Sequence, residues 1–236
     1  MEIFYYPDIQ NDIINIPAEE SKHIIKVLRK KIGDTIAITD GRGNLYQTEI
    51  ISIDKTCSAA IKSVEKKSRS HNYYFHLAFA PTKANEKIEL IVEKCVEIGV
   101  DEISPIISEH SERKVVKTER LKNVAIAAMK QSGNIYLPII NEPTTFNKFI
   151  DKKFNGNLCI AHCNNFGTPY YYDAIKEGYN LILIGPEGDF SQKEVDTAIN
   201  HGYKAVQLGN SILRVETAAI FCCSAAALKL YKRNKE

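Results

Sequence analysis

The chain has 236 residues, of which 44% are hydrophobic and 25% are charged. These proportions are those of an ordinary globular protein, and the length fits one large domain or a large domain with a smaller companion. Its 31 basic and 29 acidic side chains leave a formal charge of only +2, which excludes a polycation that attracts nucleic acid indiscriminately. Any surface for RNA must therefore come from local clusters of Lys and Arg.

The sequence also lacks the marks of a membrane or secreted protein. No apolar run approaches the roughly 20 residues that span a bilayer. The N-terminus MEIFYYPDIQ does not have the basic-then-apolar layout of a signal peptide. The six cysteines are scattered, mostly within apolar segments, without the regular spacing of a disulfide scaffold. We therefore expect a reduced, cytoplasmic protein with no membrane span.

Residues 1 to about 70 are expected to form a small β-rich part with one helix. Pro17 can open that helix, and acidic side chains follow in its first turn. The basic run 29–31 falls in the last turn and Gly33 ends the helix, in the sense that the helix dipole favours.

Basic side chains in this part offer a candidate surface for phosphates. Lys22, Lys26 and Arg29 recur at helical spacing, which suits phosphate contacts and a merely solvated helix face about equally well. The segment 35–54 predicts a β-hairpin whose glycine-rich turn carries Arg42 at its tip.

The rest of the chain is expected to form a second domain. Residues 65–72, EKKSRSHN, are polar and basic without an apolar period, as in a linker. From Tyr73 onward strands alternate with helices, which predicts a mostly parallel α/β sheet. The expected strands are 73–80, 102–107, 158–161, 181–184 and 205–208, and the expected helices include 86–98 and 119–131.

Two glycine-bearing loops follow the last two of these strands. The first, 185–188, leads into a helix that Ser191 caps, with Glu194 as its capping-box partner. The second, 209–211, leads into a final helix over 217–232. Parallel strands bring both loops to the carboxyl edge of the sheet, where open α/β sheets bind ligands, although an isolated glycine turn is often just a connection. Neither a dinucleotide fingerprint nor a phosphate loop occurs in the sequence.

Three blocks in this region stand in a characteristic order and spacing. They are Gly185-Pro186-Glu187-Gly188, Leu208-Gly209, and Ile212-Leu213-Arg214 followed by Glu216-Thr217-Ala218. In these blocks the chain resembles the ribosomal RNA small subunit methyltransferase E family, whose members methylate the N(3) position of a uridine. Further matches extend the resemblance over nearly the whole chain: His23, Val27-Leu28-Arg29, Gly33-Asp34, Lys83, Glu97-Ile98-Gly99-Val100, Ser111-Glu112-Arg113, Glu119-Arg120 and Gln131-Ser132.

The chain departs from the family's pattern in two places. Gly188-Asp189 replaces the usual glycine pair, so a negative charge stands beside the cofactor loop and could tune affinity or product release. Gly133-Asn134 replaces a basic residue often found after Gln131-Ser132, which puts one RNA contact in doubt.

The resemblance implies the fold and the assembly. Residues 71–236 would form a SPOUT-type α/β methyltransferase domain, with a mostly parallel sheet and a C-terminal trefoil knot that binds the cofactor. Residues 1–70 would form a PUA-like β-rich domain that binds RNA. The family pairs as homodimers through the knot region. The final helix, which is apolar over much of its girth, is compatible with that pairing and equally with burial inside one chain.

S-adenosyl-L-methionine is the cofactor that the resemblance implies. It is a sulfonium cation without phosphates, so its site needs backbone groups at close approach, which glycine permits, and an apolar slot for the adenine. Leu208, Ile212 and Leu213 are available to line that slot. The residues expected at the cofactor are Ala161, His162, Gly185, Pro186, Glu187, Gly188, Leu208, Gly209, Ile212, Leu213, Glu216, Thr217 and Ala218.

Methylation of a uridine ring nitrogen requires removal of its imide proton, which leaves negative charge on the flanking carbonyl oxygens. Arg214 is the first candidate for the cation that stabilises this charge, and the alternative is that it braces the loop by pairing with Glu216. Glu187 is a candidate base or cofactor-orienting group, and a capping or loop-bracing role is at least as good an explanation.

The expected partner is 16S ribosomal RNA, on the small ribosomal subunit. The candidate RNA-binding residues are Lys22, His23, Lys26, Arg29, Arg42, Lys83, Arg113 and Arg120, with Lys114 and Lys117 nearby. No metal is expected, because Cys159, His162 and Cys163 form one cluster without a second pair. The alternative function with the most similar chemistry is that of a ribose 2′-O methyltransferase. An alternative of another class is a non-catalytic ribosome-assembly factor, which Asp189 beside the cofactor loop could favour.

Overall fold

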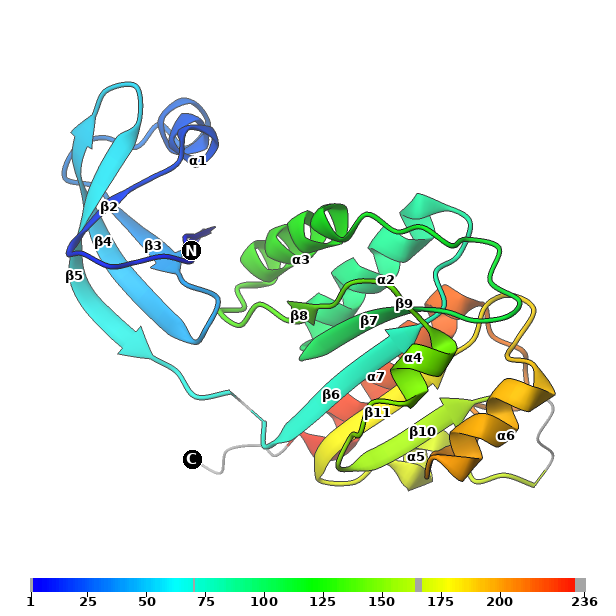
Figure 1. Cartoon of the computed structure of the whole chain (residues 1–236). Coiled ribbons are helices and arrows are strands. Elements are labelled where there is room, and N and C mark those ends of the chain that lie inside the picture. Colours follow the sequence, from blue (N-terminus) through cyan, green and yellow to red (C-terminus); the bar gives the residue numbers. More distant parts are fainter. Residues whose placement is uncertain (1, 70, 164–166, 232–236) are drawn as a thin grey trace. The chain divides into compact units, whose positions relative to one another are not determined.

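The computed structural model describes residues 2–69, 71–163 and 167–231, which fall into two compact units (Figure 1). The first unit consists of the residues up to 69 together with 126–137. The second consists of the described residues of 70–125 and of 138–236. The division expected from the sequence, with one boundary at residue 70, did not include the segment 126–137 in the N-terminal part.

The first unit is built on a curled sheet with the strand order β1-β3-β4-β5-β2. The strands are β1 (Ile3–Tyr5), β2 (Ile13–Asn15), β3 (Thr35–Thr39), β4 (Asn44–Ile53) and β5 (Cys57–Lys66). The pair β1 and β3 is parallel, and the other pairs are antiparallel. Isoleucines from several of these elements fill the core, among them Ile14, Ile36, Ile38 and Ile50.

The hairpin expected over 35–54 is confirmed, since β3 and β4 pair antiparallel around the turn that carries Arg42. The linker expected over 65–72 begins later than expected. Lys66 still pairs with Asn44 across β4 and β5, so the strand extends into the basic segment. The remainder of that segment includes residue 70, which lies outside the described residues.

The helix expected over 17–33 is wrong beyond Val27. Helix α1 (Ala18–Lys22) continues as a π-helical turn, η1 (His23–Val27), in which the Leu28 amide donates to the His23 carbonyl at 3.0 Å. The wider turn lets the neighbouring β-branched side chains at 24 and 25 pack against one core. Arg29 then adopts a left-handed φ of +54°, which ends the helix, so the run 29–31 lies outside it.

The segment 126–137 joins the first unit through its last residues. Ile135 packs against Ile3, Ala37 and Leu45. The Ile135 carbonyl accepts from the Gly43 amide at 3.0 Å. The helix that leads into this segment, α3 (Thr118–Ser132), therefore contributes residues to both units.

The second unit is an α/β layer structure whose sheet has the strand order β12-β10-β11-β6-β7-β8, with β9 paired to β7. Every described strand pair in it is parallel, so the parallel sheet expected from the sequence is confirmed. The strands are β6 (Tyr73–Phe79), β7 (Glu102–Ile107), β8 (Ile139–Ile140), β9 (Thr144–Thr145), β10 (Asn157–Ala161), β11 (Gly178–Ile184) and β12 (Lys204–Val206). The helices besides α3 are α2 (Asn85–Ile98), α4 (Phe146–Ile150), α5 (Tyr171–Ala174), α6 (Gln192–Asn200) and α7 (Val215–Leu230).

Helices cover both faces of this sheet (Figure 1). Helix α7 packs against α2, α5, β6 and β11, whereas α4 and α6 pack against each other on the opposite face. On the α4–α6 face, Phe146 and Phe149 contact strand residues such as Leu183 in a buried core. The capping box that starts α6 is confirmed, with the Ser191 amide donating to the Glu194 carboxylate at 3.0 Å.

The segment after β12 runs beside the loop before α5. The Gln207 amide donates to the Pro169 carbonyl at 3.1 Å, and the Gln207 carbonyl accepts from the Tyr171 amide at 2.9 Å. These bonds end β12 at Val206, two residues earlier than expected. The bonds also hold the segment after β12 beside the loop before α5. The trefoil knot expected in this region stays a prediction.

Candidate active site

The candidate site lies at the carboxyl edge of the parallel sheet. The loops after β10, β11 and β12 leave that edge together, because the three strands are parallel neighbours of one sheet. The loop after β6 leaves it as well, and the Ala80 amide donates to the Ile184 carbonyl at 2.9 Å. The expectation that both glycine-bearing loops meet at one edge is confirmed.

The loop 185–190 is a tight turn whose first glycine is required by packing. A Cβ at Gly185 would lie 3.1 Å from both the amide nitrogen and the ring of Phe190, whose side chain is buried. The Asp189 amide donates to the Pro186 carbonyl at 2.9 Å and closes the turn. Gly185 is therefore explained by the turn itself, before any ligand is considered.

Asp189 connects this loop to the loop after β10. Its carboxylate accepts from the Cys163 amide at 2.9 Å and from the Phe190 amide at 2.8 Å. The same carboxylate lies 2.8 Å from Nδ1 of His162, whose side chain is 3% exposed. Burial and the nearby Asp189 charge raise the pKa of the Cys163 thiol. The acidic residue that departs from the family's glycine pair thus acts as a brace between two loops.

A third loop joins the same assembly from the end of β7. His110 Nδ1 donates to the carbonyls of Asp189 and Gly188 at 3.0 Å and 3.1 Å, and these bonds raise the pKa of the imidazole. The Glu109 amide donates to the Glu194 carboxylate at 2.9 Å. The loop 108–117 is therefore bonded both to the end of the turn 185–189 and to the first turn of α6.

The two candidate catalytic side chains are exposed at this edge. Among the residues that the structure describes, neither Glu187 nor Arg214 has an ion-pair partner. Arg214 occupies the N-cap position of α7 and its side chain does not cap the helix. Glu216, which could have braced Arg214, instead lies 3.3 Å from Lys87 Nζ on α2.

The expected adenine-binding loop is open to solvent at its tip. Ile212 is 85% exposed, and Leu208 and Leu213 are partly buried. A Cβ added at Gly209 would meet no atom within 4 Å. The remaining cofactor candidates border the same edge: Ala161, Pro186 and Ala218 are buried, and Thr217 is exposed.

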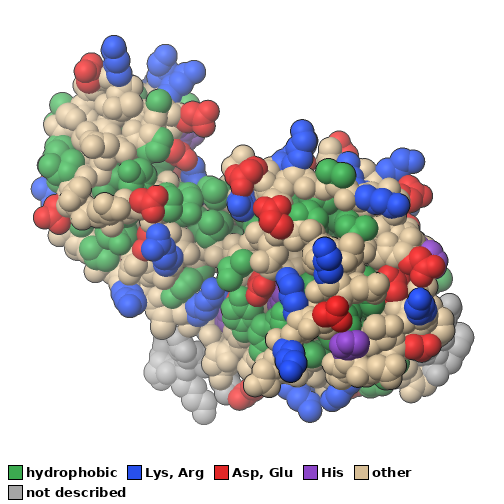
Figure 2. All heavy atoms as spheres, in the orientation of Figure 1, with side chains coloured by type: hydrophobic (Ala, Val, Ile, Leu, Met, Phe, Trp, Pro, Cys, Tyr) green, Lys and Arg blue, Asp and Glu red, His purple; other side chains and the backbone are tan. Residues whose placement is uncertain are grey.

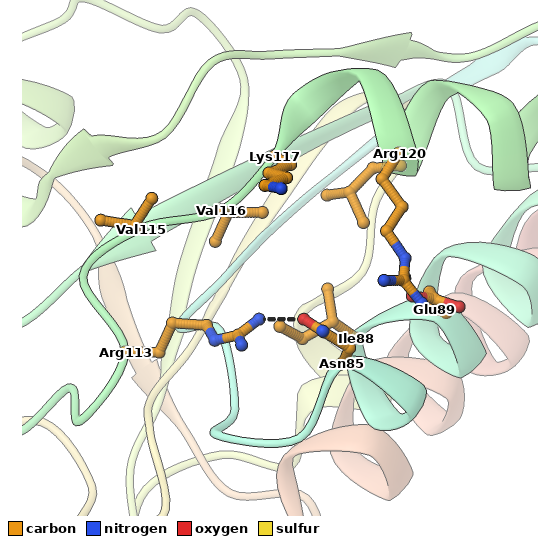
Figure 3. Close-up of a pocket in the computed structure, with 9 residues that line it drawn as sticks. Asn85, Ile88, Glu89, Arg113, Val115, Val116, Lys117 and Arg120 are labelled. Carbon is orange, nitrogen blue, oxygen red and sulfur yellow. Dashed lines mark hydrogen bonds and ion pairs between the residues drawn. The ribbon is translucent and has the colours of Figure 1, made fainter.

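A pocket of about 160 Å³ lies at the start of α2 (Figure 3). It is lined by Asn85, Ile88, Glu89, Arg113, Val115, Val116, Lys117, Arg120 and Leu121. Arg113 donates to the Asn85 side-chain oxygen, and Arg120 pairs with Glu89. The structure thus brings together two of the RNA-binding candidates on the second unit, while a third, Lys83, lies 3.7 Å from Glu112.

The RNA-binding candidates of the first unit are on its surface. Lys22, Lys26 and Arg29 are exposed, and Arg29 lies outside the helical segment that holds Lys22 and Lys26. Arg42 donates to the Pro7 carbonyl at 2.5 Å, and His23 Nε2 lies 2.7 Å from the Glu2 carboxylate. Figure 2 shows Lys and Arg side chains on the surface of each unit.

Sequence patterns did not reveal several residues of the site. The brace by Asp189 and the bonds from His110 join residues that lie far apart in the chain, so no local pattern encodes them. Within the described ranges, no group of three or more His, Cys, Asp or Glu could hold a metal ion. None of the described helices is both long enough and apolar enough to cross a membrane.

Comparisons with known proteins agree with this fold. A family model described as an RNA methyltransferase domain matches residues 69–227, and one described as an RNA methyltransferase PUA domain matches residues 16–67. The fold and the matched domains define an RNA methyltransferase with an N-terminal PUA domain. The α/β fold with a PUA-like β-rich part, expected from the sequence, is confirmed.

Relatives of known name make the family more specific. Ribosomal RNA small subunit methyltransferase E of Buchnera aphidicola (strain APS) is 30% identical over 234 residues, covering 94% of this chain and 91% of the relative. A protein named ribosomal RNA small subunit methyltransferase E 2, from Borreliella burgdorferi, is 30% identical over 230 residues, with 89% of each chain covered. The chain belongs to the ribosomal RNA small subunit methyltransferase E family.

Two solved structures are similar over nearly the full length of the chain. A probable rRNA-methyltransferase from Porphyromonas gingivalis has a TM-score of 0.91 at 39% identity, covering 98% of both chains. A putative methyltransferase from Legionella pneumophila, solved in complex with the bound cofactor SAM, has a TM-score of 0.85 at 27% identity, covering 96% of both chains.

Proposed function

We propose that this protein transfers a methyl group from S-adenosyl-L-methionine to the N(3) position of a uridine in small-subunit, 16S, ribosomal RNA. Family membership over nearly the whole chain is the observation that carries the proposal. The cytoplasm, where ribosomal subunits are assembled, is the compartment in which this substrate is available.

The loops at the carboxyl edge fit the cofactor. The Legionella neighbour binds SAM on the same fold. In this chain the backbone at Gly209 is not packed against other atoms, so a ligand can approach it. The exposed Ile212 side chain provides an apolar surface on which an adenine ring can pack. The Glu187 carboxylate, which faces solvent, suits a cofactor that carries a sulfonium and an ammonium group. The backbones of 162, 185–188 and 208–209 would hold the rest of the molecule.

The two exposed charged groups divide the chemistry between them. When bound, S-adenosyl-L-methionine supplies the electrophilic methyl group. Glu187 takes the imide proton from N(3) of the uridine. Arg214, which has no competing carboxylate among the described residues, stabilises the negative charge that this leaves on the uridine carbonyl oxygens. The lack of an Arg214–Glu216 pair favours this role over that of a loop brace.

A second copy of the chain is part of the proposal. Phe221 and Leu228 are 43% and 81% exposed in the single chain, and their spacing of seven residues puts them on one face of α7. Burial of that face by a second copy would cover apolar side chains of the helix that follows the 207–214 loop. The homodimer would thus form through the C-terminal region that carries the site.

The identity of the product tests the proposal. Purified protein is incubated with radiolabelled S-adenosyl-L-methionine and either small ribosomal subunits or free 16S RNA, both from cells that lack the modification. Mass spectrometry of the digested RNA should detect 3-methyluridine, with faster transfer to the assembled subunit. Label on a ribose would instead indicate a 2′-O methyltransferase. Cofactor binding without any transfer to either RNA would indicate a non-catalytic factor.

A further inference from the structure

The pocket at the start of α2 combines a positive rim with an apolar floor. Its lining includes three cations, Arg113, Lys117 and Arg120, against the carboxylate of Glu89. Arg120 is compensated by Glu89, but Arg113 bonds to the neutral Asn85 amide group. Figure 3 shows the Arg113 side chain reaching toward Asn85 and the Arg120 side chain reaching toward Glu89. A positive charge is therefore left over inside the pocket.

Two further features strengthen the positive potential there. Helix α2 begins at Asn85, and Ala84 at its N-cap has no side chain that could accept from the first-turn amides. Lys117 is exposed and, within the described residues, forms no ion pair. The nearby Glu112 carboxylate lies 3.7 Å from Lys83 Nζ, and within the described residues it forms no ion pair with Arg113. An anionic group is the ligand that this end of the pocket would attract.

The other side of the pocket is apolar. Ile88 and Leu121 are 1% and 3% exposed and form its floor, and Val115 at the rim is 76% exposed. A cavity of about 150 Å³ can hold one benzene-sized ring, and this pocket has a volume of about 160 Å³. One flat ring with an attached anion, as in a pyrimidine nucleotide, fits this combination better than a free anion, which would not need the floor.

The pocket is adjacent to the candidate active site. The loop 108–117, which carries Arg113, is bonded through His110 to the carbonyls of Gly188 and Asp189. Lys87 on α2 pairs with Glu216 in the first turn of α7 at 3.3 Å. A nucleotide in the pocket would therefore lie on the same sheet edge as Glu187 and Arg214.

We propose that this pocket binds one unstacked nucleotide of the ribosomal RNA that neighbours the methylated uridine. Its base packs on Ile88 and Leu121, and its phosphate contacts Arg113 and Lys117. The proposal rests on the proposed function for the identity of the RNA. It adds a second anchoring point, so that the target uridine is positioned by a neighbour as well as by the cofactor loops.

The test uses the full-length protein and a fluorescently labelled oligouridylate, titrated over a range of salt concentrations. The double variant Arg113→Gln/Lys117→Gln should weaken binding by at least about tenfold, the loss expected for charge-assisted hydrogen bonds to one phosphate. For this variant, the slope of the logarithm of the binding constant against the logarithm of the salt concentration should be shallower by about 0.7. That difference is the contribution of one phosphate on single-stranded RNA. Calorimetric affinity for S-adenosyl-L-methionine should not change.

A matched control removes a positive charge from α2 at a position away from the pocket. Lys94 pairs with Glu93 and Glu97 and lies about 13 Å further along α2, so Lys94→Gln should bind the oligouridylate like the unaltered protein. Val115→Asp, at the exposed rim, should weaken binding by repelling the phosphate without disturbing the core. Uridine 5′-monophosphate should compete better than inorganic phosphate.

The outcomes separate this proposal from the proposed function. If the double variant and Val115→Asp bind like Lys94→Gln while methylation of subunits is normal, the pocket proposal is wrong and the function stands. Equal competition by phosphate and uridine 5′-monophosphate would refute the base contact. If binding depends on the pocket but the unaltered protein never methylates RNA, the proposed function is wrong and a nucleotide-binding pocket remains.

Discussion

At the scale of single residues, Asp189 has a role that its sequence context did not reveal. The turn 185–188 and the capping box at Ser191 could be predicted, because their residue types specify the local backbone. Asp189 adopts a φ of +60° and contacts His162, which is distant in the chain. Its brace depends on where the sheet places the two loops, and a single sequence does not encode that placement locally.

Substitution of Asp189 should therefore weaken cofactor binding. Asp189→Gly allows the left-handed backbone conformation without strain, but it removes the carboxylate that accepts from the Cys163 and Phe190 amides. We expect about tenfold weaker binding of S-adenosyl-L-methionine, since charge-assisted hydrogen bonds contribute about 1.5–3 kcal/mol each. Isothermal titration calorimetry measures this affinity.

Asp189→Ala serves as the comparison, because alanine loses the same contacts and is also strained at positive φ. It should unfold at a lower temperature than Asp189→Gly by an amount equivalent to about 1 kcal/mol. Unchanged cofactor affinity in both variants would contradict the brace and leave Asp189 as a tolerated substitution for glycine.

At the scale of elements, the long regular elements could be predicted and the irregular ones could not. Helices α2 and α3 and strand β7 lie within one residue of their expected bounds, because apolar period and end signals agree there. The π-helical turn η1 was missed, since the run after Lys22 still has helical spacing and tertiary packing decides its width. Strands β8 and β9 have two residues each, too short for any period.

A buried histidine joins three strands of the second unit. His76 on β6 lies 2.6 Å from the Tyr179 hydroxyl on β11 and 2.8 Å from the Ser104 hydroxyl on β7. Burial lowers its pKa to about 4, opposed by the Glu102 carboxylate at 3.7 Å and assisted by the Lys152 charge. In the unfolded chain the imidazole titrates near its ordinary value of about 6.5.

Acid should therefore destabilise the native state through His76. Above about pH 6.5 the imidazole is neutral in both states. As the pH falls toward 4 the unfolded state binds the proton first, so the free energy of unfolding decreases, by up to about 3 kcal/mol in total. Urea unfolding between pH 7 and pH 4.5 should show a smaller decrease for His76→Gln than for the unaltered protein. Equal pH dependence would show that His76 is not the group responsible.

At the scale of the whole molecule, the class of sheet could be predicted but its strand order could not. Alternating strands and helices specify a parallel sheet, whereas the order β12-β10-β11-β6-β7-β8 depends on contacts between distant segments. The inclusion of 126–137 in the first unit could not be predicted for the same reason. The sequence around Ile135 does not indicate that this side chain packs against Ile3 and Leu45.

The apolar face of α7 predicts how copies of the molecule associate. Leu228→Glu, alone or with Phe221→Glu, should convert a dimer to a monomer, because the charges would be buried without partners at the interface. Sedimentation equilibrium measures the change. Ile199→Glu is the matched control, since Ile199 is an apolar residue on α6 with 47% exposure, and it should remain dimeric. A monomeric unaltered protein would contradict the predicted interface.

The central claim is that the exposed Arg214 at the start of α7 stabilises charge on a uridine during methyl transfer. The most direct test is the single-turnover rate of methylation of small ribosomal subunits at saturating S-adenosyl-L-methionine, with cofactor affinity measured in parallel. We predict that Arg214→Ala lowers this rate by about 10²–10³-fold with nearly unchanged cofactor affinity, and that Arg214→Lys recovers part of it. Transfer by Arg214→Ala at the unaltered rate, or a loss explained entirely by weaker cofactor binding, would contradict the claim.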